Sequence, residues 1–329
     1  MPSLMDLPQE IRAMIFEEVI NGHRIPPKYP SESNMLRASD VPRTLPMELY
    51  HEKRDTHSLS NCLSLLLTNR QVSVETQSVL NRMKKTTYIL DLSVLNEMHM
   101  FSTWISVPRL TTRLSTLHID MRFFGRIVTS KEALYSGSTT FSLNHCFYRY
   151  LDRFLTYGPV GRKDGREDSY EDEDRGIIVE NLVLDFHSAE TELPFPPGHM
   201  SYEDWEAKRC GNPRCDDEQM DEVLKYKTRP QWPLSAMRLW LAFITKMGYG
   251  VEDYGSILYE SIGTISLLLN GRLETAFDLA DQLAEVPNEM YDRYSNFNVP
   301  KFQKWRERTL SRREAVGLRT VQPRDLWSR

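Results

Sequence analysis

The sequence predicts an α/β fold, in which helices surround a mixed β-sheet that ends in a C-terminal β-hairpin. Segments rich in β-branched, leucine and aromatic side chains, which are typical of strands, begin near Thr86, Leu114, Ile177, Thr264 and Arg272. Segments with helical spacing of apolar residues separate them, at 143–158 and 234–247. Strands that alternate with helices in this way favour one common sheet.

The dipeptide Asn270-Gly271 is the clearest turn signal in the chain, because it favours the type I′ turn that matches the twist of two antiparallel strands. Three strand-like segments, LSTLHIDM, VENLVLDF and ISLLLNG, also share a leucine-rich pattern. They begin near Leu114, Val179 and Ile265, at unequal intervals far longer than a leucine-rich repeat of roughly 20–29 residues. We therefore expect a single sheet, with a solenoid only as the minor alternative.

The N-terminal segment predicts a helix over 7–20. Asp6 is suited to cap it, and Pro8 fits the first turn, where the N–H groups have no partner within the helix. On a helix that turns by about 100° per residue, its apolar side chains cover more than half of the circumference, with Arg12 among them. This arc favours a helix that buries one side in the chain and offers the other to a partner. Burial of both sides within the protein is the open alternative.

Further along the chain, a Pro-rich stretch at 24–55 has no sustained period and predicts a long loop. The strongest helical pattern covers 63–85 and ends in two lysines, which suit a helix C-terminus. Ser93 is placed to cap another helix that continues to about Ile105. A run of seven acidic and four basic residues at 162–175 predicts a flexible surface loop.

The composition excludes several classes of protein. A formal net charge of −5 and a pI of about 6.0 argue against a nucleic-acid binder. Four cysteines do not make a disulfide framework in a chain of 329 residues. No apolar run approaches the roughly 18 residues of a membrane span, and acidic residues interrupt the N-terminus as a signal peptide. We expect a protein of the cytoplasm or nucleus with no membrane partner.

Two stretches together resemble a known family. The opening LMDLPQEIRAMIFEEVI resembles the start of an F-box, whose hallmark is Leu-Pro-x-Glu followed by an Ile/Phe-rich helix. The later LLLTNRQVSVETQSVL, at 65–80, is similar to the second F-box helix. The pair is most similar to F-box-like proteins of filamentous fungi, where a strand follows; Asn69 stands where that family often has Cys. The resemblance covers about 4–92.

The resemblance implies a protein-interaction function. F-box helices dock on the Skp-type adaptor of cullin–RING ubiquitin ligases, while the C-terminal region recruits a target, here unidentified. The positions that match adaptor contacts are Leu7, Pro8, Ile11, Ile15, Phe16 and Val19. The Pro-rich stretch separates the two helices further than in ordinary F-boxes. A second hypothesis is therefore a scaffold whose F-box-like helices belong to its own core and bind no adaptor. Exposure of Leu7, Pro8 and Phe16 distinguishes the two.

Enzyme motifs are lacking: the sequence has no Gly-rich phosphate loop, no His-Glu-x-x-His helix and no Gly-x-Ser-x-Gly elbow. His118 lies in an apolar strand pattern, which favours a structural role, and Cys62 and Cys146 are expected to fill core space. Cys210 and Cys215 flank a turn and are weak candidates for zinc, since four residues separate them and no second pair follows. We expect no enzyme and no cofactor.

The chain divides into three predicted parts. Residues 1–85 are the F-box-like helical segment with the Pro-rich insertion at 21–58, and we expect its helices to pack on the sheet, because no linker follows the second one. Residues 86–300 are the α/β body, with the acidic loop at 158–176. Residues 301–329 form a basic helical tail, with nine Lys or Arg against three acidic residues. We expect this tail to lie against the acidic loop or in solvent rather than on phosphates, where Trp305 would stack.

Overall fold

The structure is a computed structural model that describes the chain in separate stretches. These are residues 4–30, 35–38, 48–52, 60–95, 99–124, 139–159, 176–189, 193–199, 201, 227–246, 256–286 and 299–323. The candidate zinc ligands Cys210 and Cys215, and residues 160–175 of the predicted acidic loop, lie outside them. Among the described helices, none combines the length and the apolar character needed to cross a membrane.

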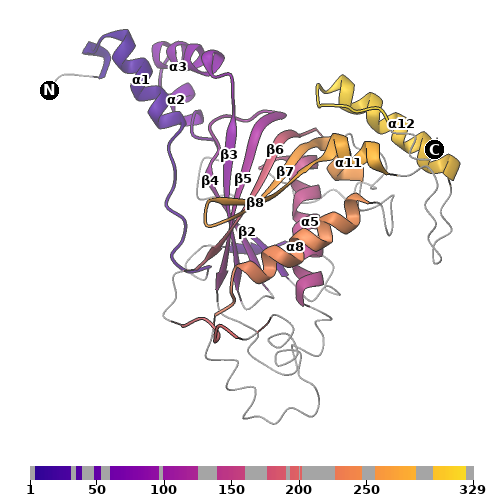
Figure 1. Cartoon of the computed structure of the whole chain (residues 1–329). Coiled ribbons are helices and arrows are strands. Elements are labelled where there is room, and N and C mark those ends of the chain that lie inside the picture. The colour runs from indigo at the N-terminus through magenta and orange to yellow at the C-terminus, as the bar shows by residue number, and fades with distance from the viewer. Residues whose placement is uncertain are drawn as a thin grey trace.

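The described strands form one eight-stranded mixed sheet, which confirms the predicted α/β class. The strands are β1 (Met35–Arg37), β2 (Glu48–Glu52), β3 (Thr87–Leu95), β4 (His99–Ser106), β5 (Arg113–Phe124), β6 (Ile178–Ser188), β7 (Ile262–Leu269) and β8 (Arg272–Asp278). Their order across the sheet is β1-β2-β4-β3-β5-β6-β7-β8 (Figure 1). β3, β5, β6 and β7 are parallel neighbours, whereas β1, β4 and β8 each run antiparallel to one neighbour.

The predicted hairpin is present between β7 and β8. Asn270 and Gly271 have positive φ angles of 50° and 79°, as both central residues of a type I′ turn require. The strands on either side pair antiparallel, from Leu269 with Arg272 onward. The three leucine-rich segments are β5, β6 and β7 of this one sheet, so the chain is not a solenoid.

The two faces of the sheet differ: helices cover its apolar face, and the opposite face carries polar side chains. The helices are α1 (Gln9–Ile20), α2 (Leu63–Thr68), α3 (Arg70–Arg82), α5 (Thr139–Tyr157), α8 (Gln231–Thr245), α10 (Ser256–Ser261), α11 (Leu279–Glu285) and α12 (Val299–Ala315). α5 and α8 lie over the face that carries Leu90, Ile119 and Leu184, and these side chains share the main apolar core (Figure 1). Because side chains alternate along a strand, Asp91 and Asp120 point to the opposite face.

The N-terminal helices form a small unit at one end of the sheet (Figure 1). Their buried side chains, among them Phe16, Ile20 and Val72, make an apolar cluster separate from the main core. Polar contacts join the unit to the body; for example, Arg109 donates to the Leu80 carbonyl oxygen of α3 at 3.1 Å. The expectation that these helices pack on the sheet was wrong, because α5 and α8 already cover its apolar face.

The two N-terminal helix boundaries differ from the prediction. α1 begins at Gln9, with Pro8 in the N-cap position and no side-chain cap, so Asp6 does not cap the helix. It belongs instead to a short 3-10 turn, Leu4–Asp6. The predicted helix over 63–85 is divided into α2 and α3 at Asn69.

Asn69 explains that division. Its backbone is extended, with a φ of −159°, and its side-chain oxygen accepts a hydrogen bond from the backbone N–H of Val72 at 3.0 Å. Asparagine is among the best N-cap residues, because its side chain satisfies a backbone donor that the first turn leaves without a partner. A new helix therefore starts at this position.

Strands occupy two segments for which we predicted other structure. The predicted helix from Ser93 to Ile105 is instead the end of β3 followed by β4. Side chains in β4 such as Phe101 and Trp104 favour strands, and pairing with β3 decides between the two structures. β1 and β2 lie in the stretch predicted as loop, where they extend the edge of the sheet.

The basic tail belongs to the body of the protein. α12 packs beside α10, and its Phe302 is part of the main core. Trp305 lies against the rings of Tyr259 and Phe302, with ring centroids 6.1 and 5.8 Å apart. Arg313 is fully buried and donates to the carbonyl oxygens of Tyr259 and Ile262 at 2.5 and 2.9 Å. One side of the described tail is therefore buried against the body, where we expected the tail to lie on the acidic loop or in solvent; its other side is exposed, and residues 160–175 of that loop lie outside the described residues.

Candidate functional site

The N-terminal helix α1 has a buried side and an exposed side. Arg12, Phe16 and Ile20 are buried, and their spacing of four residues places them in one row along the helix. Phe16 and Ile20 contribute to the cluster shared with α2 and α3. This side therefore fixes the position of α1 on its neighbouring helices.

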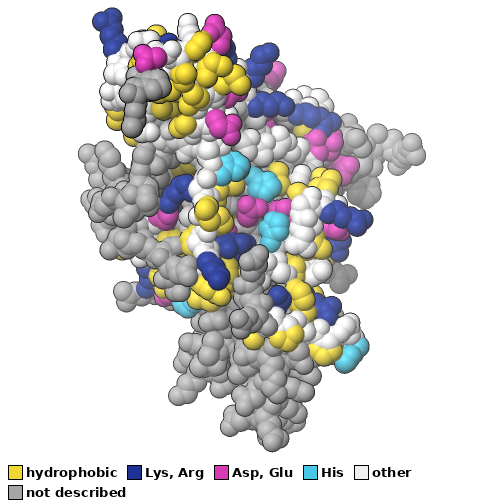
Figure 2. All heavy atoms as spheres, turned by 90° about the vertical axis from the view of Figure 1, so that its left-hand side faces the viewer, with side chains coloured by type: hydrophobic (Ala, Val, Ile, Leu, Met, Phe, Trp, Pro, Cys, Tyr) yellow, Lys and Arg dark blue, Asp and Glu magenta, His cyan; other side chains and the backbone are white. Residues whose placement is uncertain are grey.

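The other side of α1 and the turn before it present large apolar side chains to solvent. They are Leu4, Leu7, Ile11, Met14, Ile15 and Val19, with exposed fractions from 36% to 66%. Steps of three or four residues connect them, which makes a continuous row on a helix surface. We call these six residues the apolar face. Figure 2 shows hydrophobic side chains gathered over this end of the molecule, next to acidic ones.

A partly buried ion pair fixes the position of the apolar face. Arg12 donates from Nε and Nη2 to the two carboxylate oxygens of Glu75 on α3, at 2.8 and 2.5 Å. It also donates to the backbone oxygen of Leu7, just before α1. The hydrogen bonds from Arg12 lower the pKa of Glu75 more than burial raises it. The pair therefore ties both the helix and the turn before it to α3.

The residues matched to adaptor contacts divide between the two sides. Leu7, Pro8, Ile11, Ile15 and Val19 are exposed. Phe16 has no exposed surface and packs inside the helical cluster. It is therefore a support for α1 and not a contact surface in this structure, whereas the apolar face gains two residues, Leu4 and Met14.

The neighbouring helices add exposed apolar side chains of their own. Leu63 and Leu67 on α2 are 43% and 75% exposed, and Val74 on α3 is 64% exposed. Monomeric proteins rarely expose large connected apolar patches, and such patches mark protein-interaction sites. The concentration of these side chains on the N-terminal unit points to that unit as an interaction site.

A group of ionisable side chains lies on the polar face of the sheet. Strand register places Asp91, Asp120 and Asp185 side by side on β3, β5 and β6. Asp91 is bound by both Nε and Nη2 of Arg122, the latter at 2.8 Å. Ser93 also donates to it at 2.8 Å. The first carboxylate of the row is therefore neutralised by its own cation.

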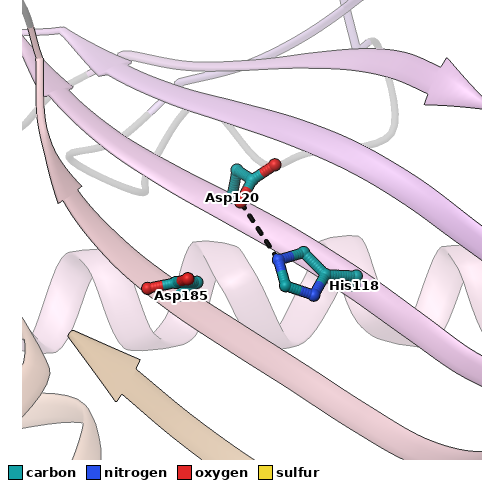
Figure 3. A group of neighbouring side chains, drawn as sticks. All are labelled: His118, Asp120 and Asp185. Atoms are coloured by element: carbon teal, nitrogen blue, oxygen red, sulfur yellow. Dashed lines mark hydrogen bonds and ion pairs between the residues drawn. The ribbon is translucent and has the colours of Figure 1, made fainter. Parts of the chain in front are cut away.

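Two histidines surround the other two aspartates. Nε2 of His118 lies 3.1 Å from Asp120 Oδ1, and Nε2 of His187 lies 3.3 Å from the same oxygen and 3.2 Å from Asp185 Oδ2. Figure 3 shows His118 and Asp120 directed toward each other, with Asp185 beside them on the next strand. Burial raises the pKa of Asp120, but hydrogen bonds from both histidines lower it more, so it lies below its usual range. The bond to Asp120 likewise raises the pKa of His187.

This cluster was not predicted from the sequence, and only a structural role was assigned to His118. The signal was the pair of mirrored tripeptides His118-Ile-Asp120 and Asp185-Phe-His187. Residues two apart in a strand share a face, so each tripeptide places a histidine and an aspartate together. The register that sets the two tripeptides beside each other could not be read from the sequence.

Comparison with known proteins gives no relative on which to base a function: no family model, no curated protein and no solved structure matches this chain.

Proposed function

We propose that the apolar face of α1 docks on a Skp-type adaptor, and that the chain is an F-box-type substrate receptor of a cullin–RING ubiquitin ligase. The observation that carries the proposal is the exposure of the apolar face on a helix that the Arg12–Glu75 pair and Phe16 hold in place. The F-box resemblance of the same residues supplies the identity of the partner.

Burial of the apolar face provides the driving force for docking. Full burial of a large aliphatic side chain stabilises a complex by about 1.5–3 kcal/mol relative to exposure, and these side chains are already partly buried. An amphipathic helix that offers such a row suits a hydrophobic groove on a partner. Because α1 is ordered before it binds, little conformational entropy is lost on docking.

A scaffold remains the second candidate function, and two observations favour it. Phe16 is buried within the chain, and the cluster of α1, α2 and α3 is a complete small core. If the protein is a scaffold, the F-box-like helices stabilise its own core, and the apolar face contacts a different protein or none.

Binding to a purified Skp-type adaptor, measured by calorimetry, separates the two functions. We expect the intact chain to bind, and a Leu7→Ala/Pro8→Ala double variant to bind at least tenfold more weakly with an unchanged melting temperature. Leu239→Ala is a matched control, since this leucine is 67% exposed on the distant helix α8. No binding by the intact chain would favour the scaffold. Equal binding by all three proteins would contradict docking through Leu7 and Pro8.

A further inference from the structure

We propose that His118, Asp120, Asp185 and His187 bind one Zn²⁺ ion between β5 and β6, on the polar face of the sheet. The proposal is independent of adaptor docking, because the cluster lies on the sheet and the apolar face lies on α1. Two imidazole nitrogens and two carboxylate oxygens form the donor set. Zinc accepts nitrogen and oxygen ligands of this kind.

The distances between the donor atoms fit a tetrahedral ion. Zinc bonds to nitrogen and oxygen are about 2.0–2.2 Å long, so neighbouring ligand atoms of a tetrahedron lie about 3.3–3.6 Å apart. The three measured separations, of 3.1, 3.3 and 3.2 Å, lie close to that edge length. Donor atoms of His118, Asp120 and Asp185 all lie within 4.8 Å of one another. His187 is not part of that group of three, although its Nε2 lies close to both carboxylates, so a rotation of its side chain would have to complete the tetrahedron.

The hydrogen bonds of this cluster are shared between partners. Nε2 of His187 carries at most one hydrogen, yet it lies between Asp120 Oδ1 and Asp185 Oδ2 at nearly equal distances. Asp120 Oδ1 in turn faces both imidazoles. A central cation would contact all four donor atoms at once, in place of hydrogen bonds that are shared between partners.

Local charge also favours a cation. Asp120 and Asp185 bring two negative charges to neighbouring strands, and the nearby Arg122 is engaged by Asp91. The imidazole nitrogens are neutral ligands when zinc is bound, so one Zn²⁺ would balance the two carboxylates. Calcium and magnesium prefer six or more oxygen ligands, which makes them poorer matches for this donor set.

The surroundings of the cluster provide access and orientation. The side chains of His118, Asp120 and His187 are 30%, 33% and 31% exposed, so an ion can enter from solvent. Histidine side chains are also visible in the middle of this face in Figure 2. Asp185 is buried, and its Oδ1 accepts a hydrogen bond from the Gly271 N–H at 3.0 Å. Such a second contact holds a metal ligand in its binding orientation.

Four protein ligands would leave no open coordination position, so we assign the ion a structural role. It would join β5 to β6 through their side chains, and through Gly271 it would also fix the β7–β8 hairpin. The expected consequence of zinc binding is a more stable sheet.

The test is calorimetric titration of the full chain with ZnCl2 after treatment with a chelator. We expect one high-affinity ion per chain, a higher melting temperature, and no comparable effect of MgCl2. Asp120→Asn and His187→Ala should each weaken the affinity at least tenfold while the chain stays folded by circular dichroism. His23→Ala, a substitution of an exposed histidine outside the cluster, should leave zinc binding unchanged.

A Cys210→Ser/Cys215→Ser double variant separates this site from the cysteine pair. Retained zinc binding in that variant supports the assignment. Loss of zinc in the cysteine variant together with unchanged binding in Asp120→Asn would overturn it, as would the absence of zinc binding by the intact chain. The absorption spectrum of the Co²⁺-substituted protein gives a further test. We expect no thiolate charge-transfer band, because all four ligands are nitrogen or oxygen atoms.

Discussion

Helices α1 and α12 lie at the two ends of the described chain, and they use their apolar side chains differently. On α12, Phe302 is buried and Trp305 packs against the main core, and no large apolar side chain is exposed between residues 302 and 315 of that helix. On α1, Phe16 is buried, but Ile11 and Met14 remain exposed. A terminal helix that completes a core hides its apolar side chains, whereas α1 retains a second apolar side that the described part of the chain leaves exposed.

The two helices also differ in the partners of their buried arginines. Arg313 of α12 is buried against carbonyl oxygens of the body and makes the tail part of the fold. Arg12 of α1 is buried against the carboxylate of Glu75 within the helical unit. Buried charge thus fixes both helices, but only α1 is fixed in a position that leaves an apolar row outside.

The largest expected effect comes from the buried side of α1. Phe16→Ala should lower the free energy of unfolding by about 3–5 kcal/mol, because it removes a fully buried aromatic ring from a small cluster. Denaturant unfolding measures the change, and Ile15→Ala is the control on the exposed side. Equal losses for Phe16 and Ile15 would show that the two sides of α1 are not distinct.

The next effect concerns the attachment of α12. Arg313→Ala should destabilise the protein by about 3 kcal/mol, since the carbonyl oxygens of Tyr259 and Ile262 lose a charged donor in a buried place. Thermal melting and denaturant unfolding measure it. Arg308→Ala provides a matched control on the exposed side of α12, where a change within about 0.5 kcal/mol is expected. A similarly small change for Arg313 would contradict the view that the tail belongs to the body.

The Arg12–Glu75 pair predicts a pH dependence. Arg12 lowers the pKa of Glu75 in the folded protein, so the pair stabilises the fold fully above the usual glutamate pKa of about 4.3. This stabilisation is lost as the pH falls from there through the lower folded pKa. Melting temperatures between pH 7 and pH 3 should therefore fall less steeply in Glu75→Gln than in the intact chain. Parallel curves would show that Glu75 has the same pKa in both states.

The smallest effect on stability is expected on the apolar face. Ile11→Ser and Val19→Ser should change the free energy of unfolding by no more than about 0.5–1 kcal/mol, since both side chains are already exposed. The same substitutions should weaken adaptor binding, because serine does not replace an aliphatic contact. A large loss of stability would indicate that the chain itself covers these positions.

Most of the sheet could be predicted from the sequence, because the signals lie within single strands and turns. β3, β5, β6, β7 and β8 carry β-branched and apolar runs, and the Asn270-Gly271 turn specifies its own geometry. β4 was predicted as part of a helix because Ser93 is suited to cap one, and only pairing with β3 shows that the segment is a strand. β1 and β2 had no distinctive pattern, since strands at the edge of a sheet need less apolar surface.

The candidate site was predicted in part. The wide apolar arc of α1 indicated two functional sides, but the sequence could not show that Phe16 belongs to the inner one. The histidine and aspartate cluster depends on the register between β5 and β6, a tertiary feature that neither strand encodes alone. Arg12, a charged residue within the apolar arc, is explained by Glu75, which lies 63 positions away in the sequence.

Oxidation of methionines tests the exposure of the apolar face most directly. Met14 is 66% exposed, whereas Met100 and Met121 are fully buried and serve as internal controls in the same chain. With a mild oxidant and mass spectrometry, we expect Met14 to oxidise much faster than the two controls in the free protein, and a bound Skp-type adaptor to slow Met14 alone. Slow oxidation of Met14 in the free protein, or an unchanged rate in the complex, would contradict docking through the apolar face.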